Sequence, residues 1–102
     1  MKTVICPLAR TCVEVEFKRG QYTKFVNDLA KGVWRTYDFE IEKTQAVSLF
    51  KEMKHALSSG ACGSHHINGY GYGWYVQVHK GMWPMLTKKR DGRYILIVST
   101  VR

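Results

Sequence analysis

The sequence predicts an α+β fold, a mostly antiparallel sheet of four to six strands with two helices packed on one face. Several segments alternate apolar and polar residues, which is typical of half-buried strands. Two other segments repeat their apolar residues with the helical period. The 102 residues, 45% of them hydrophobic, are enough for one core, and we expect a single domain over residues 1–102.

Two strands and a helix are expected in the first third of the chain. Thr3–Cys6 is a short apolar segment that Pro7 interrupts, and Thr11–Phe17 alternates apolar and polar residues. Over Gln21–Lys31 the apolar residues recur at helical spacing, and Gly32 follows as a helix stop. This part of the chain therefore supplies a pair of strands and the first helix.

A third strand and the second helix follow. Val33–Glu42 carries apolar residues on one face and acidic residues on the other, which predicts a half-buried strand. Thr44 is a candidate N-cap for the next helix, which Gly60 ends. Residues 58–73 contain five glycines in sixteen positions. Because ordering glycine costs backbone entropy, we expect a long loop there.

The last third predicts a meander of strands. Trp74–His79 alternates again, and Met82–Thr87 is expected at a sheet edge because Pro84 cannot donate a ladder hydrogen bond. The Asp-Gly pair at 91–92 is a strong hairpin signal. Tyr94–Val101 is apolar on both faces over most of its length, so we expect it near the centre of the sheet.

Cysteine content bears on the cellular compartment. Cys6, Cys12 and Cys62 are an odd number, which excludes a complete set of disulfides, and we expect reduced thiols in a cytoplasmic protein. The N-terminal residues lack the pattern of a signal peptide. The longest apolar run, Tyr94–Val98, is too short to span a membrane. These features favour a soluble cytoplasmic protein.

Charge is distributed unevenly along the chain. Sixteen Lys and Arg against eight Asp and Glu give a formal net charge of +8. Residues 52–102 hold seven basic residues, only two acidic residues and all four histidines. Such an acid-poor half indicates a positive face and an anionic partner, either nucleic acid or an acidic protein surface. The alternative is that the charge serves only solubility.

Aromatic and basic residues of the second half form the leading candidate binding site. Aromatic rings stack on bases and neighbouring cations hold phosphates, which is what binding of a single strand requires. The alternative is that the rings belong to the core and the basic run to a solvated hairpin tip. The candidate residues are Tyr70, Tyr72, Trp74, Tyr75, His79, Lys80, Lys88, Lys89, Arg90 and Arg93.

The glycine-rich segment has two further interpretations. Phosphate-binding loops lead from a strand into a helix N-terminus, whereas this segment leaves a helix and enters a strand. As a zinc site, Cys62, His65 and His66 give one compact cluster without the second ligand pair that structural zinc sites usually have. We therefore expect neither a metal nor a cofactor.

These observations rank three functions. The first is a small basic binding protein without enzymatic activity, with nucleic acid as its favoured anionic partner. The second is a small inhibitor or adaptor, of the phage or mobile-element type, that binds a host protein such as a nucleic-acid-handling enzyme. The third is a metal-independent ribonuclease using His65 or His66 as base and Lys80 or Arg90 as the stabilising cation. No motif supports catalysis, so no catalytic residue is assigned.

Overall fold

The α+β class is confirmed by the computed structural model, which describes residues 1–8, 10–57, 62–67, 71–76 and 80–100. For residues 56–57, 62–67, 71–72 and 74–76 it describes the backbone alone. In chain order the elements are β1 (Lys2–Leu8), β2 (Thr11–Glu16), α1 (Gln21–Lys31), β3 (Arg35–Ile41), α2 (Lys43–Leu57), β4 (Cys62–Ile67), β5 (Gly71–Val76), β6 (Met82–Lys88) and β7 (Tyr94–Thr100).

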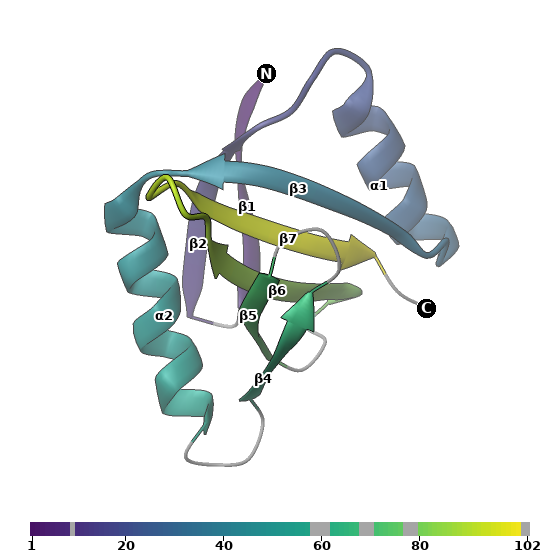
Figure 1. Ribbon diagram of the computed structural model, residues 1–102. Helices are drawn as coiled ribbons and strands as arrows, with labels where there is room; N and C mark the ends of the chain where they lie inside the picture. Colours follow the sequence, from purple (N-terminus) through teal and green to yellow (C-terminus); the bar gives the residue numbers. More distant parts are fainter. Residues whose placement is uncertain (9, 58–61, 68–70, 77–79, 101–102) are drawn as a thin grey trace.

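The strands form two antiparallel sheets. One is the β1–β2 hairpin, and the other has five strands in the order β3-β7-β6-β5-β4, within the predicted four to six. The two helices pack on one face of the large sheet, as expected. The β1–β2 hairpin lies between them, behind the large sheet in the view of Figure 1. This hairpin thus belongs to the layer that the sequence had assigned to the helices alone.

The core lies between this layer and the large sheet. The Phe17 ring centroid is 5.3 Å from that of Phe25 in α1 and 5.0 Å from that of Phe39 in β3. Phe25 also meets Tyr37 edge to face at 5.1 Å, a favoured aromatic geometry. The residues of α2 that are at most 1% exposed are Ala46, Leu49 and Met53. One cluster therefore joins both helices, the hairpin and the sheet.

The predicted bounds of α1 are confirmed, and its end has a clear cause. Gly32 has a φ of 66°, in the left-handed region, and donates its backbone N–H to the carbonyl of Asp28. Glycine adopts this conformation without the steric cost of a Cβ, so the helix ends there.

The placement of the last two strands is partly confirmed. β7 is central as predicted, with Leu96 and Val98 in the main core and Ile95 and Ile97 in a second buried cluster on the opposite face. The edge placement of β6 is wrong, because β6 lies between β5 and β7. Within the described part of the chain, β5 pairs with residues 85–87 of β6, so Pro84 lies outside these pairs and its missing N–H removes none of their hydrogen bonds.

The loop expected over residues 58–73 is wrong for most of its length. β4 and β5 pair antiparallel through six consecutive residue pairs, from Cys62 opposite Val76 to Ile67 opposite Gly71. Ladder hydrogen bonds offset the backbone entropy that ordering these glycines costs. Gly63, Gly71 and Gly73 thus lie within strands, whereas residues 58–61 and 68–70 are outside the described part of the chain.

The expectation of three reduced cysteines is also wrong. Cys6 and Cys12 form a disulfide, and the antiparallel pairing of β1 with β2 brings their Cα atoms to 4.0 Å. The odd count excluded a complete set of bridges but not one bridge across a tight hairpin. The cytoplasmic assignment loses this support and stays a prediction, because disulfides persist mainly in oxidising compartments. Neither described helix has the length and hydropathy needed to cross a membrane.

Candidate nucleic-acid interface

The predicted site residues that the structure describes are spread along the sheet. Tyr70 and His79 lie outside the described residues. Lys80 lies in the turn before β6, with the uncommon positive φ of 51°. Lys88 is at the other end of β6, and six strand residues span about 20 Å, so these two lysines are far apart. The predicted residues in β5 are Tyr72, Trp74 and Tyr75.

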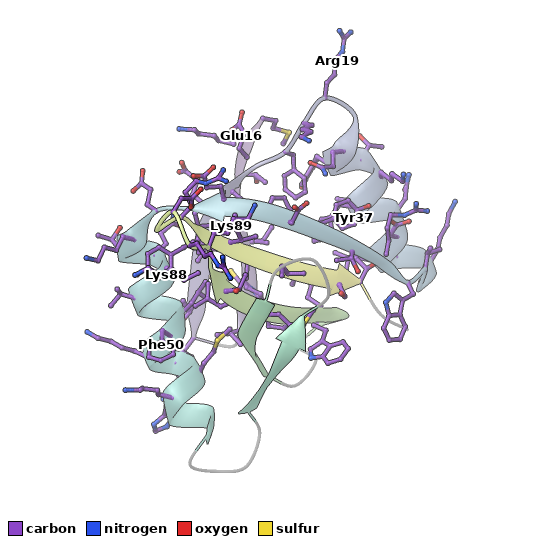
Figure 2. All side chains as sticks on the ribbon, in the orientation of Figure 1. Glu16, Arg19, Tyr37, Phe50, Lys88 and Lys89 are labelled. Atoms are coloured by element: carbon purple, nitrogen blue, oxygen red, sulfur yellow. A yellow bond between two sulfur atoms is a disulfide. The ribbon has the colours of Figure 1, made fainter. Side chains whose placement is uncertain are left out.

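A groove of about 510 Å³ lies between α2 and the ends of β6 and β7, and we call it the α2–β6 groove. Ala46 and Leu86, both buried, form its floor, and the partly buried rings of Phe50 and Tyr94 line it from opposite elements. Figure 2 shows Phe50 on α2 with Lys88 beside it. The interior of this groove is therefore largely apolar and aromatic.

Three lysines surround this apolar interior: Lys51, Lys54 and Lys88, hereafter the groove lysines. Residues 47, 50, 51 and 54 share one face of α2 because they are spaced by three, four and seven positions. Lys88 stands opposite Tyr94 in the β6–β7 ladder, so the hairpin brings a cation and a ring together. Helix periodicity and strand register thus build the groove from two distant parts of the chain.

Each ring carries an ammonium over its face. Lys54 Nζ lies 5.2 Å from the centroid of Phe50, and Lys88 Nζ lies 5.6 Å from that of Tyr94. A cation–π contact at an exposed site contributes about 0.5–1 kcal/mol, so either ammonium can leave its ring for a stronger partner. Within the described ranges, no groove lysine forms an ion pair with a carboxylate. The groove therefore presents three uncompensated positive charges.

The β6–β7 turn extends this positive surface. Lys89 and Arg90 lie in this turn, next to Lys88, and neither side chain forms an ion pair with a carboxylate among the residues described. Lys89 donates its backbone N–H to the carbonyl of Arg93 at 2.8 Å, and Gly92 allows the chain to reverse with a φ of 91°. The Asp-Gly hairpin signal is confirmed, and it places two further cations next to Lys88.

Arg93 differs from its neighbours because its charge is already compensated. Its Nε donates to Asp91 Oδ2 at 2.8 Å, and its Nη1 lies 3.7 Å from Glu40 Oε2. Hydrogen bonds from the backbone and side chain of Arg93 hold the pKa of Asp91 below its usual range. We therefore leave Arg93 out of the candidate interface, although the sequence pattern included it.

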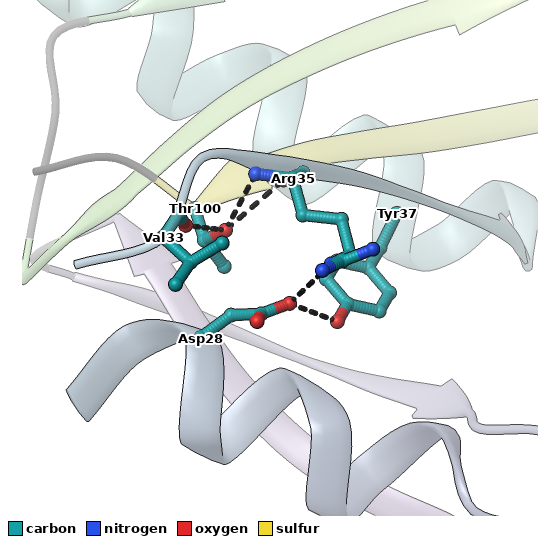
Figure 3. Close-up of polar contacts among 5 residues, drawn as sticks. All are labelled: Asp28, Val33, Arg35, Tyr37 and Thr100. Carbon is teal, nitrogen blue, oxygen red and sulfur yellow. Dashed lines mark hydrogen bonds and ion pairs between the residues drawn. The ribbon is translucent and has the colours of Figure 1, made fainter. Parts of the chain in front are cut away.

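A second polar cluster lies at the other end of the sheet, around the buried carboxylate of Asp28 (Figure 3). Asp28 Oδ2 accepts a 2.6 Å hydrogen bond from the Tyr37 hydroxyl and a 2.8 Å bond from Arg35 Nε. The bond from Tyr37, assisted by Arg35, holds the pKa of Asp28 below its ordinary value. Burial and the same bond raise the pKa of Tyr37 to about 12. The buried Asp28 and Tyr37 side chains are hydrogen-bonded to each other within the fold, so this cluster is structural.

Sequence reasoning missed the half of the groove that α2 supplies. The predicted site residues did not include Phe50, Lys51 or Lys54. Their spacing on one face, beside the exposed Val47, was the available signal. The possible zinc ligands of the glycine-rich segment lie in β4, with side chains outside the described part. Elsewhere in the described chain no three metal-ligating side chains cluster.

Comparisons of this chain with protein-family models, with curated proteins and with solved structures gave no match. Function is therefore inferred from the residues of the groove and the surfaces around it.

Proposed function

We propose that this protein is a small non-enzymatic binding protein that engages nucleic acid through the α2–β6 groove and the adjoining turn. One observation carries the proposal: the groove lysines have no carboxylate partner among the described residues and surround two aromatic rings. Cations that hold phosphates next to rings that stack on bases are the two components of single-strand binding sites. Lys89 and Arg90 extend the same surface.

Phosphate contacts make affinity depend on salt in a predictable way. Each contact with a single strand releases condensed counterions and adds about −0.7 to the slope of log affinity against log salt. If all three groove lysines contact phosphates, they account for a slope of about −2. Salt dependence alone would not locate the site, since a net charge of +8 attracts polyanions to any positive surface.

A pair of charge-matched variants locates the site. The first replaces the three groove lysines by Gln. The second replaces three exposed cations outside the groove, again by Gln: Lys18, Arg19 and Lys31. Each variant lowers the formal net charge from +8 to +5. Arg19 lies well away from Phe50 in Figure 2, so the second variant changes total charge without touching the groove.

Fluorescence anisotropy with a labelled single-stranded oligonucleotide, titrated at several salt concentrations, provides the measurement. We expect the groove variant to lose most of its affinity and to flatten the salt slope by about 2, while the control variant changes little. Equal losses in the two variants, or no binding by the unmodified protein at low salt, would falsify the proposal. Circular dichroism checks that both variants are folded.

One observation favours a second candidate, an adaptor or inhibitor that binds another protein. Trp34 is 65% exposed and packs edge to face on Trp83, with ring centroids 6.3 Å apart. Tryptophan is enriched at protein interfaces, where its large surface supplies much of the binding energy. A pull-down from native lysate with and without nuclease separates the candidates. A single protein retained after nuclease and lost on Trp34→Ala supports the second.

A further inference from the structure

We infer that the α2–β6 groove holds one unstacked base of a single strand while the groove lysines hold the neighbouring phosphates. This inference rests on the proposed function and narrows it from nucleic acid in general to single-stranded nucleic acid. It names an unstacked base as the occupant of the apolar interior of the groove, which the charge of the groove lysines alone does not identify.

The groove is divided into an apolar interior and a charged margin. Ala46 and Leu86 offer no polar side-chain atom to a phosphate, so a phosphate alone leaves the interior unused. A duplex presents phosphates outward and keeps its bases stacked, and therefore does not fill the interior either. An unstacked nucleotide has an apolar flat part and a charged part, which matches this division. A volume of about 510 Å³ is within the usual range for small-ligand sites.

Two aromatic rings line the groove. Phe50 and Tyr94 come from α2 and β7, so the groove has an aromatic side chain on each of two facing elements. Lys54 and Lys88 now lie over these rings. An incoming base replaces an ammonium at the ring, and the released ammonium moves to the phosphate that arrives with the base. The displaced cation–π contact is thus replaced by stacking and by a charge pair.

The polar side chains that line the groove bear on selectivity among bases. Bidentate readout of a base edge needs a carboxylate, an amide or a guanidinium in a fixed position. The lining of the groove contains none of these among the described residues, since its polar side chains are the lysines and Thr87. Stacking accepts any base because every base has a π-face. We therefore expect binding that depends on having a base but depends little on which base it is.

The unmodified protein tests this with three probes of equal length, about ten nucleotides. These are an oligothymidylate, the same backbone with every base removed, and a duplex. We expect the oligothymidylate to bind about tenfold more tightly than the abasic strand, and the duplex to bind no better than the abasic strand. Equal affinity for the two single strands overturns the inference and leaves charge-driven binding standing. No binding to any probe overturns the proposed function as well.

Two substitutions assign the effect to the groove. Tyr94→Leu and Phe50→Leu keep apolar volume and charge but remove a ring, and Trp34→Leu is the control because Trp34 is exposed and does not line the groove. We expect each groove variant to lose about tenfold in affinity for oligothymidylate and nothing for the abasic strand. If both groove variants bind oligothymidylate as the unmodified protein does, the base is not in the groove. The probe comparison does not need either variant to fold.

Discussion

Replacing Tyr37 by Phe tests the buried cluster at Asp28 by removing a single atom. The Tyr37 side chain is 3% exposed, and its hydroxyl donates to Asp28 Oδ2 at 2.6 Å. In the variant Asp28 keeps its bond from Arg35 Nε and loses the other. The ring still packs on Phe25, so the change isolates the hydrogen bond from the packing.

The magnitude follows from the character of the bond. A hydrogen bond to a charged group contributes about 1.5–3 kcal/mol, so near neutral pH the variant should unfold with a free energy lower by about 2 kcal/mol. In a domain of this size each kcal/mol changes the melting temperature by roughly 4–8 °C. The melting temperature should therefore fall by roughly 10 °C.

The difference in stability between the unmodified protein and the Tyr37→Phe variant should become smaller at alkaline pH. The folded pKa of Tyr37, about 12, lies above the ordinary value of 10.0 because burial and Asp28 disfavour the phenolate. The stabilisation is therefore complete below pH 10.0 and is lost as pH rises through about 12. Two pKa units correspond to roughly 3 kcal/mol. The Phe variant has no phenol to titrate, so its stability approaches that of the unmodified protein above about pH 10.

Urea denaturation followed by circular dichroism, at neutral pH and at several alkaline values, measures both effects. Tyr22→Phe is the matched control because Tyr22, like Tyr37, packs edge to face on a core phenylalanine, here Phe17, but its hydroxyl has no hydrogen-bond partner within the described ranges. We expect the control to follow the unmodified protein at every pH. A Tyr37→Phe variant as stable as the unmodified protein at neutral pH, or a stability gap that stays constant into the alkaline range, refutes the reasoning.

Three further changes have defined outcomes. Asp28→Asn should make stability less sensitive to acid. The lowered pKa of Asp28 gives stability that is present above the ordinary pKa of 3.8 and is lost as pH falls through the pKa of the folded state. Equal acid unfolding profiles of the variant and the unmodified protein would contradict this. Leu49→Ala, at 0% exposure, should cost about 2–5 kcal/mol by urea denaturation, whereas Val47→Ala, at 40% exposure, should cost far less. Mass spectrometry after alkylation should find Cys6 linked to Cys12, and reduction should lower stability by roughly 2 kcal/mol because the closed loop is short.

Most of the fold was predictable from local pattern. Helical spacing gave both bounds of α1, and alternation gave β2 and β3 to within two residues at either end. The position of β6 within the sheet could not be predicted from Pro84, because the cost of its missing N–H depends on which residues of the neighbouring strand pair with β6. The pairing of β4 with β5 was missed for a related reason: glycine composition reports the cost of ordering a segment but not the ladder that offsets it.

The candidate site was predictable only where it is local in sequence. Lys88, Lys89 and Arg90 follow one another, and their closeness to Tyr94 follows from a short hairpin. Phe50 and the two α2 lysines are about forty residues away from Tyr94, and only the packing of α2 on the sheet brings them to the same groove. Compensation of Arg93 by Glu40 likewise depends on a tertiary contact, between β3 and the turn that precedes β7.

The α2–β6 groove also connects occupancy to the lifetime of the protein. Its two walls come from α2 and from the β6–β7 hairpin, so anything bound across it is held only while the chain is folded. By mass action, a partner at a hundred times its dissociation constant adds about 2.7 kcal/mol to the free energy of unfolding. Because the population of unfolded molecules sets exposure to proteases, a partner that fills the groove as proposed should raise the steady-state amount of this protein.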